Sequence, residues 1–345
     1  MKVLAAIFCA VFSLHAAFAA EPTLDIYWID VEGGASTLIV TPNKESVLID
    51  SGWPWAPSAE RIYAVATNAG LKQIDYLITT HFHVDHFGGA AGLSKLMPIK
   101  NIWDNGALDV DPDSPGPNGT RFSTADYRAI SSTRKVIAPG DSVPLKTSKS
   151  RRLSLRCIAA HKKLAADLAG SANPRCAGAE PKPVDPSDNA NSICLVLTYN
   201  GFKFFNGGDL TWNIESELVC PLDHVGNVDV YQVDHHGMDI SNNPLLLQTL
   251  GPTVSVMDNG PHKGGSRKTV ERLRATPSIK AMYQLHRDLR GDQPFNTENK
   301  YIANLEENCT ANYIKCSVDQ SGKTYTFSIP ATGFSETYKS KPKHM

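Results

Sequence analysis

The stretch of sequence that decides the fold runs from Thr80 to Gly89 and reads THFHVDHFGG. It directly follows an apolar segment, residues 74–79, and it places four metal-binding side chains within six residues: His81, His83, Asp85 and His86. At the end of a strand, the first two can face one ion while the last two face a second. Neutral imidazole and carboxylate suit zinc-like divalent ions, and two such ions can activate a shared water molecule. The stretch therefore predicts a metal site.

The pattern H-x-H-x-D-H resembles the signature of the metallo-β-lactamase superfamily, and the resemblance can be followed from about residue 25 to residue 284. It implies the α/β fold of that superfamily, a four-layer αββα sandwich, and a metal-dependent hydrolase. It also implies roles for two further acids. Asp50, at the end of VLID, would orient the metal cluster and take part in catalysis with Asp85, and Asp209, at the end of FFNGGD, would bridge the ions.

The last ligand motif of the family corresponds to VDHHG, residues 233–237. One of His235 and His236 would ligate the second metal, and the other would contact the substrate or be structural. Gly237 would let the backbone turn sharply near the metals. The HHG form is most similar to two branches, the hydrolase domain of bacterial DNA-uptake channels and the phosphorylcholine esterases. Both act on phosphodiesters, which favours that substrate class.

One position departs from the family pattern. Where the family supplies a third histidine for the first metal, the chain has DNANS, residues 188–192. Asn191 could lie near the metal, bind the substrate or cap the strand, and His161 could substitute from a neighbouring strand. A further loop, NGPHKGG, contains His262 and Lys263, which could steady an anionic substrate or belong to a solvated turn. The other histidines, His224, His286 and His344, are interpreted as solvated or core residues.

The first twenty residues resemble a signal peptide, with Lys2 before an apolar run and the small-x-small sequence Ala17-Phe18-Ala19. An uncleaved anchor is the alternative. The prediction is a single hydrolase domain over residues 21–345 with a C-terminal β extension. The protein would be periplasmic or secreted, with no membrane span after signal removal, because no later apolar stretch is long enough.

Six cysteines remain after residue 20, and an oxidising compartment permits disulfides. Cys309 and Cys316 are the favoured pair, and Cys157 could pair with Cys176. Cys194 lies in an apolar strand and is interpreted as a buried thiol. No cysteines have C-x-x-C spacing, which argues against a thiolate metal site.

Composition indicates a globular enzyme, with 41% hydrophobic residues and a net charge of −1. A basic excess typical of nucleic-acid binding is missing, so we expect a small or short anionic substrate and no extended nucleic-acid groove. Two divalent ions are the expected cofactors, zinc first and manganese or iron as alternatives. The predicted reaction is attack of metal-activated hydroxide on a phosphodiester. The alternatives are a carbon-centred hydrolase of the lactonase, β-lactamase or thioesterase type and a non-catalytic metal-binding domain.

The order of elements alternates between strands and helices. Hydrophobic patterning predicts a strand over 24–31, a hairpin over 36–40 and 46–49, a helix over 58–68 capped by Ser58, and a helix over 90–97. Long polar loops are expected over 109–120 and 170–191, and the second could border the site. Residues 36–50 and 192–209 share one pattern, in which a hairpin is followed by an aspartate. This internal repeat is consistent with two β-rich halves that enclose the metals.

Overall fold

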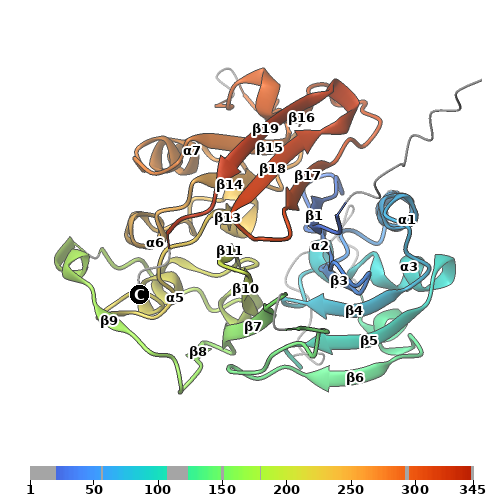
Figure 1. Ribbon diagram of the computed structural model, residues 1–345, viewed down its shortest axis with the longest axis horizontal. Coiled ribbons are helices and arrows are strands. Elements are labelled where there is room, and N and C mark those ends of the chain that lie inside the picture. The colour runs from blue at the N-terminus through green and yellow to red at the C-terminus, as the bar shows by residue number, and fades with distance from the viewer. Residues whose placement is uncertain are drawn as a thin grey trace, which may run out of the picture.

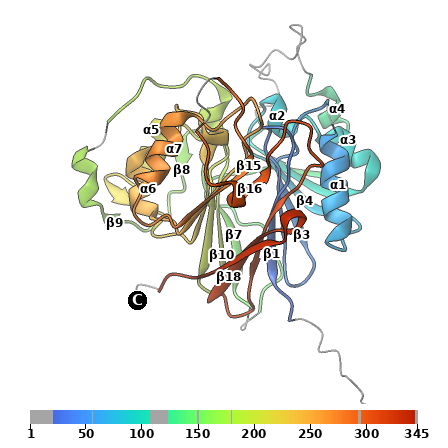
Figure 2. The same cartoon turned by 90° about the horizontal axis from the view of Figure 1, so that it is seen from above.

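The computed structural model describes residues 21–55, 57–106, 123–148, 151–178, 180–291 and 295–342. The predicted signal segment and the predicted loop over 109–120 lie outside the described residues. Two large β-sheets pack face to face, and helices cover the outer face of each sheet (Figures 1 and 2). The predicted αββα sandwich is confirmed.

The first sheet has, within the described ranges, nine strands in the order β19-β18-β17-β1-β2-β3-β4-β5-β6. Their bounds are β1 (Leu24–Trp28), β2 (Thr37–Val40), β3 (Ser46–Ile49), β4 (Ile74–Thr79), β5 (Ile99–Asp104), β6 (Thr133–Val136), β17 (Ile314–Val318), β18 (Thr324–Ile329) and β19 (Phe334–Lys339). Strands β3 to β6 pair in parallel. The C-terminal strands β17 to β19 form an antiparallel meander that joins the sheet through β1.

The second sheet has eight strands among the described residues, in the order β16-β15-β14-β13-β11-β10-β7-β8. Their bounds are β7 (Leu153–Ala160), β8 (Lys163–Leu164), β10 (Cys194–Tyr199), β11 (Phe202–Asn206), β13 (Val230–Gln232), β14 (Val254–Met257), β15 (Ala281–His286) and β16 (Ile302–Asn304). Two short strands, β9 (Ser171–Ala172) and β12 (Leu222–Asp223), pair with each other outside both sheets.

Each sheet has its own layer of helices (Figure 2). The first sheet is covered by α1 (Ser58–Asn68), α3 (Ala90–Leu96) and α4 (Ala125–Arg128), and the short α2 (Val84–Phe87) follows β4. The second sheet is covered by α5 (Trp212–Glu217), α6 (Pro244–Leu250) and α7 (Arg267–Arg274). Single 3-10 turns are η2 (Pro174–Gly178), η3 (Asp188–Asn191), η4 (Asp234–Gly237), η5 (Asn299–Tyr301) and η6 (Pro330–Thr332). Within the described ranges, every helix is too short or too polar to span a bilayer.

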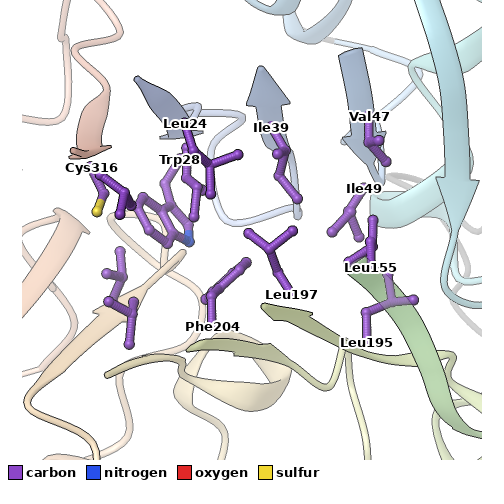
Figure 3. Close-up of a cluster of buried hydrophobic side chains, with 14 of the residues drawn as sticks. Leu24, Trp28, Ile39, Val47, Ile49, Leu155, Leu195, Leu197, Phe204 and Cys316 are labelled. Atoms are coloured by element: carbon purple, nitrogen blue, oxygen red, sulfur yellow. The ribbon is translucent and has the colours of Figure 1, made fainter. Parts of the chain in front are cut away.

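The main core lies between the two sheets and follows from alternation along the strands. In β2, Ile39 faces the second sheet, whereas Leu38 and Val40 face the helices that cover the first. In β11, Phe204 packs into the inter-sheet core, whereas Phe205 faces the outer helices. Figure 3 shows the inter-sheet contact, with side chains from both sheets: Leu24, Trp28, Val47, Ile49, Leu155, Leu195 and Leu197. This packing fixes the strand ends at which the polar residues lie.

Most of the predicted elements are present, with two corrections. The helix over 58–68 has the predicted bounds, but Ser58 does not cap it. Pro57 occupies the N-cap, the side-chain capping hydrogen bond is missing, and Ser58 is the first helical residue. The first strand ends at Trp28 instead of residue 31, because Asp30 turns away and accepts a hydrogen bond from the Glu32 amide (3.0 Å).

The predicted disulfide pairs are wrong. The structure joins Cys176 to Cys220, and the other four cysteines of the described chain are thiols. Cys316 cannot reach Cys309, because its side chain points from β17 into the inter-sheet core beside Trp28 (Figure 3). Cys157 likewise faces that core from β7, while Cys176 lies on η2. Cys194 is a buried thiol, as predicted.

We expect the purified protein to contain the Cys176–Cys220 disulfide. Its residues are 44 positions apart, and closing a loop of that length stabilises the fold by about 4 kcal/mol in the chain-entropy model. Alkylation after unfolding should therefore add two more groups when reductant is used first, and peptide mapping should place both on these cysteines. A linked peptide containing Cys309 and Cys316 would contradict this assignment.

Candidate metal centre

The predicted ligands converge because they all follow strands that end at the same edge of the two sheets. His81 and His83 follow β4, Asp50 follows β3, Asp209 follows β11, and the two histidines of η4 follow β13. Strands β3 and β4 pair in parallel, and so do β11 and β13. Parallel strands present their carboxyl ends at one edge, so residues distant in sequence meet there.

Asp209 lies at the centre of the cluster. Its Oδ2 atom is close to the Nε2 atoms of four imidazoles: 3.2 Å from His86, 3.4 Å from His235, 3.5 Å from His236 and 3.8 Å from His81. The carboxylate of Asp209 therefore faces imidazoles that follow strands of both sheets. Its bridging role stays a prediction.

Asp85 forms the second half of the cluster. Its Oδ2 atom lies 3.1 Å from His236 Nε2 and 3.6 Å from His86 Nε2, and it also contacts the ammonium group of Lys263. The cluster contains two groups of three residues, and within each group the ligand atoms lie within 4.8 Å of one another. The first group is His81, His86 and Asp209, and the second is Asp85, His86 and His236. The ring of His83 stacks edge-on to that of His81, with centroids 4.6 Å apart.

Polar groups behind the cluster orient its imidazoles. Asp50 Oδ2 lies 2.8 Å from His86 Nδ1, and Thr80 donates to both oxygens of Asp50 from its amide (2.7 Å) and its hydroxyl (2.8 Å). Asp258 Oδ1 lies 3.3 Å from His236 Nδ1. In each case Nδ1 faces a carboxylate and Nε2 faces the cluster, which is the arrangement typical of metal-binding histidines. Asp50 is one of the residues predicted from the sequence, whereas no sequence pattern pointed to Asp258.

The segment that stands where the family has its third histidine anchors the backbone of the H-x-H motif. Asp188 accepts a hydrogen bond from the amide of Phe82 (2.7 Å), which lies between His81 and His83. Asn191 donates to Asp188 (2.9 Å), so it supports this anchor. His161 Nε2 lies 3.2 Å from the carbonyl oxygen of Ile137. Within the described contacts, neither Asn191 nor His161 approaches Asp209.

His235 is the histidine that approaches Asp209 instead. Its Nδ1 atom lies 3.3 Å from the hydroxyl of Ser241, so its Nε2 atom is turned toward the cluster. Both His235 and His236 have left-handed backbone conformations, with φ of 55° and 52°. Such conformations are uncommon in non-glycine residues and cost of order 1–3 kcal/mol each. They allow two adjacent side chains to face one centre, which sequence patterning does not reveal.

Gly237 makes the tight turn after these histidines possible. Its φ is +82°, and a Cβ atom there would lie 2.8 Å from Met257 Sδ and 3.0 Å from the Gly265 amide nitrogen. Glycine is the residue that tolerates both conditions.

The pKa values of Asp85, Asp209 and His81 are shifted toward the protonation states that bind cations. Burial raises the pKa of Asp85, but Lys263 and His86 outweigh burial and hold the pKa well below its usual range. Burial likewise opposes ionisation of Asp209, and the surrounding histidines keep its pKa low. Burial lowers the pKa of His81 well below its ordinary value. Ionised carboxylates and a neutral imidazole are the forms that bind metal.

The residues fit a divalent ion on two further observations. The Nε2 atom of His81 is buried without a hydrogen-bond partner in the described part of the chain, although buried polar groups are normally satisfied. Burial disfavours a charged His86, yet Asp209, Asp50 and Asp85 raise its pKa to about 10. The pKa of His236 is also raised, chiefly by Asp209 and Asp258 acting against burial, so without an ion these imidazoles take up protons whose positive charge a bound cation would replace.

The two predicted residues of the glycine-rich loop lie in different places. Lys263 reaches the cluster at Asp85, and its Nζ lies 4.8 Å from the ring centroid of Trp53. His262 is exposed and pairs with Glu307 at 2.8 Å. The structure therefore brings Lys263, but not His262, to the metal ligands.

A family model and several known proteins are similar to this chain. Residues 29–141 match the family model of the metallo-beta-lactamase superfamily. The chain is 24% identical to ComE operon protein 3 of Bacillus subtilis over 68% of its length, and 25% identical to Recombination protein 2 of Haemophilus influenzae over 73%. It spans only 28% and 27% of those proteins. A solved metallo hydrolase, Igni18 of Ignicoccus hospitalis, aligns with a TM-score of 0.45 and 14% identity, over 80% of this chain and 97% of that one.

The fold, the H-x-H-x-D-H motif and the family match lead to one conclusion. Residues 29–141 form a metallo-beta-lactamase domain, and the fold together with the His/Asp cluster is that of a metal-dependent hydrolase.

Proposed function

We propose that this metal-dependent hydrolase cleaves a phosphodiester in a small or short anionic substrate. The observation that carries the anionic substrate is the position of Lys263, and the HHG resemblance selects the phosphodiester among anions. Its ammonium group contacts Asp85 within the ligand cluster, while a third of its side chain remains accessible to solvent. A cation at the rim of a carboxylate-rich site can bind a substrate anion that the carboxylates would otherwise repel.

The resident side chains have separate tasks in this proposal. Asp50 holds the imidazole of His86 in one orientation, the Asp258 carboxylate lies 3.3 Å from His236 Nδ1, and Lys263 holds the anion beside them. Two divalent ions, with zinc as the expected metal, would lower the pKa of water enough to supply hydroxide near neutral pH and would stabilise negative charge on oxygen. The similarity of the HHG motif to phosphodiester-cleaving branches supports the same substrate class.

A carbon-centred hydrolase is the second candidate. Lys263 could equally bind a carboxylate, such as that of a β-lactam or a hydrolysed lactone. The nearly balanced net charge of −1 also shows no basic excess that would point to a polymeric phosphodiester.

A substrate screen separates the two candidates. The purified protein, saturated with Zn²⁺ or Mn²⁺, is assayed with bis-p-nitrophenyl phosphate, a lactone and a chromogenic cephalosporin. We expect the highest kcat/KM with the phosphodiester and loss of turnover after chelation. Preferential hydrolysis of the lactone or cephalosporin would overturn the phosphodiester proposal and support the second candidate.

Removal of the Lys263 ammonium should weaken substrate binding more than it slows the chemical step. A charge-assisted hydrogen bond contributes about 1.5–3 kcal/mol, so Lys263→Ala should raise KM for an anionic substrate roughly 10- to 100-fold. Lys263→Arg should restore part of this loss. The matched control is Lys268→Ala, because Lys268 is an exposed lysine on α7 that pairs with Asp239. An unchanged KM in Lys263→Ala would remove Lys263 from the site.

We also propose that the protein acts in the periplasm or outside the cell. The signal-like first twenty residues support this location, and so does the Cys176–Cys220 disulfide, because disulfides persist in oxidising compartments. Cell fractionation followed by N-terminal sequencing tests it. We expect a mature chain that begins near Ala20 or Glu21, and recovery of full-length protein in the cytoplasmic fraction would contradict the proposal.

A further inference from the structure

We propose that Asp30, Glu32, His286 and Cys309 form an additional metal site, which takes one divalent ion of the zinc class. This site is separate from the cluster around Asp209 and does not depend on the proposed substrate. Its residues share no ligand with that cluster.

The four side chains come from three distant segments of the chain. Asp30 and Glu32 lie in the turn after β1, His286 is the last residue of β15, and Cys309 lies between β16 and β17. Their ligand atoms all lie within 4.8 Å of one another. Asp30 and His286 are buried, whereas Glu32 and Cys309 are partly exposed, so an ion could enter from solvent.

The distances require only small adjustments to bind an ion. His286 Nε2 lies 2.7 Å from Asp30 Oδ1, and Cys309 Sγ lies 3.3 Å from Asp30 Oδ2 and 4.0 Å from His286 Nε2. Ligand atoms around tetrahedral zinc are about 3.3–3.8 Å apart, as follows from zinc–ligand bonds of about 2.0–2.3 Å. Thiolate, imidazole and carboxylate are also the donors that zinc prefers in proteins.

Arg61 lies beside the four residues and completes the charge balance. Its guanidinium nitrogens lie 3.0 Å from Asp30 Oδ2 and 2.7 Å from Glu32 Oε1. With the thiol ionised, the four ligands carry three negative charges and Arg61 carries one positive charge. A divalent ion brings the sum to zero. Each carboxylate has two oxygens, so Arg61 can keep one oxygen of each while the other faces the ion.

The ion would stabilise a turn that borders the loop of Lys263. Gly33 lies between Asp30 and the next strand. It packs so closely against the other loop that a Cβ atom at this position would lie 2.8 Å from the Gly260 nitrogen and 3.1 Å from Lys263 Cβ. A metal bound by Asp30 and Glu32 would hold this turn against the end of β15. The site is therefore structural, as expected for a four-ligand set that leaves no open position.

Cobalt substitution tests the site with a spectroscopic readout. The cluster around Asp209 contains no thiol among its described residues, so a thiolate-to-cobalt charge-transfer band in the near ultraviolet would report only on Cys309. We expect the full-length protein titrated with Co²⁺ to show this band. We expect Cys309→Ser to lose the band and to bind one equivalent fewer of metal.

A second variant, Glu32→Gln, and an alkylation measurement on the wild-type protein test the same site independently. Glu32→Gln should weaken the band, whereas Glu60→Gln, an exposed acid of α1, should leave it unchanged. In the wild-type protein, Zn²⁺ should slow alkylation of Cys309 at least 10-fold relative to chelator-treated protein. A wild-type protein that shows neither the band nor this protection would overturn the proposal and leave the four residues as an ion-pair network with Arg61.

Discussion

Asp209→Asn should abolish hydrolysis, with a loss in kcat/KM beyond roughly 10³-fold, the upper range for removal of one electrostatic contact in an active site. Four imidazole nitrogens lie within 3.8 Å of its Oδ2 atom, so the carboxylate faces both halves of the cluster. The amide is neutral, and it would remove negative charge from both metal positions at once. The measurement is kcat/KM at saturating metal, together with metal content.

The matched variant for this prediction is Asn191→Ala. Asn191 donates a hydrogen bond to Asp188, and Asp188 in turn holds the Phe82 amide. Loss of one such bond costs roughly 1–3 kcal/mol, or about 10- to 100-fold in rate if all of it affects the transition state. Asn191→Ala should thus be the milder change. If it were the more damaging one, Asp209 would not be the bridging residue.

The fold could be predicted because a short local motif carries the resemblance to the metallo-β-lactamase superfamily, and the candidate ligands lie in the same local patterns. The run from Thr80 to Gly89 places its ligands on a strand end and a short helix, and the hairpins before Asp50 and Asp209 are visible as alternating apolar residues. Such patterns indicate the local secondary structure of each segment. The αββα sandwich itself followed from the family resemblance, and the two packed sheets confirm it.

Contacts between distant segments could not be read in this way. Asp258 meets His236, and Asp188 meets Phe82, only after β14 and η3 are placed. The disulfide pairing failed for the same reason: Cys316 packs into the inter-sheet core, whereas Cys309 contacts Asp30, and their proximity in sequence does not reveal this. Cysteine spacing likewise does not reveal that Cys309 lies next to His286, with Sγ 4.0 Å from Nε2.

Asp85→Ala should also abolish hydrolysis and should remove one of the two metal equivalents from the cluster around Asp209. Asp85 is the carboxylate that faces His86 and His236, and its pKa is held low, so it is ionised at neutral pH. Without it, the second set of ligands retains two imidazoles and the shared Asp209. We expect a loss in kcat/KM of at least roughly 10²- to 10³-fold, measured together with metal content. Asp167→Asn, at an exposed acid paired with Arg156, is the surface control.

Asp85→Ala would also lower kcat/KM if Asp85 served only to neutralise Lys263, so this cause must be distinguished from the loss of a metal ligand. Asp85 also pairs with Lys263, and its removal would leave the ammonium group facing His236 without a counter-charge. If Asp85 served only to neutralise Lys263, the double variant Asp85→Ala/Lys263→Ala would recover to the activity of Lys263→Ala alone. If Asp85 binds the ion, the double variant stays inactive and still lacks one metal equivalent, because no other described carboxylate lies within reach of both His86 and His236 except Asp209. We expect the second result, since the Asp85 oxygen lies between two imidazoles that point at the same position.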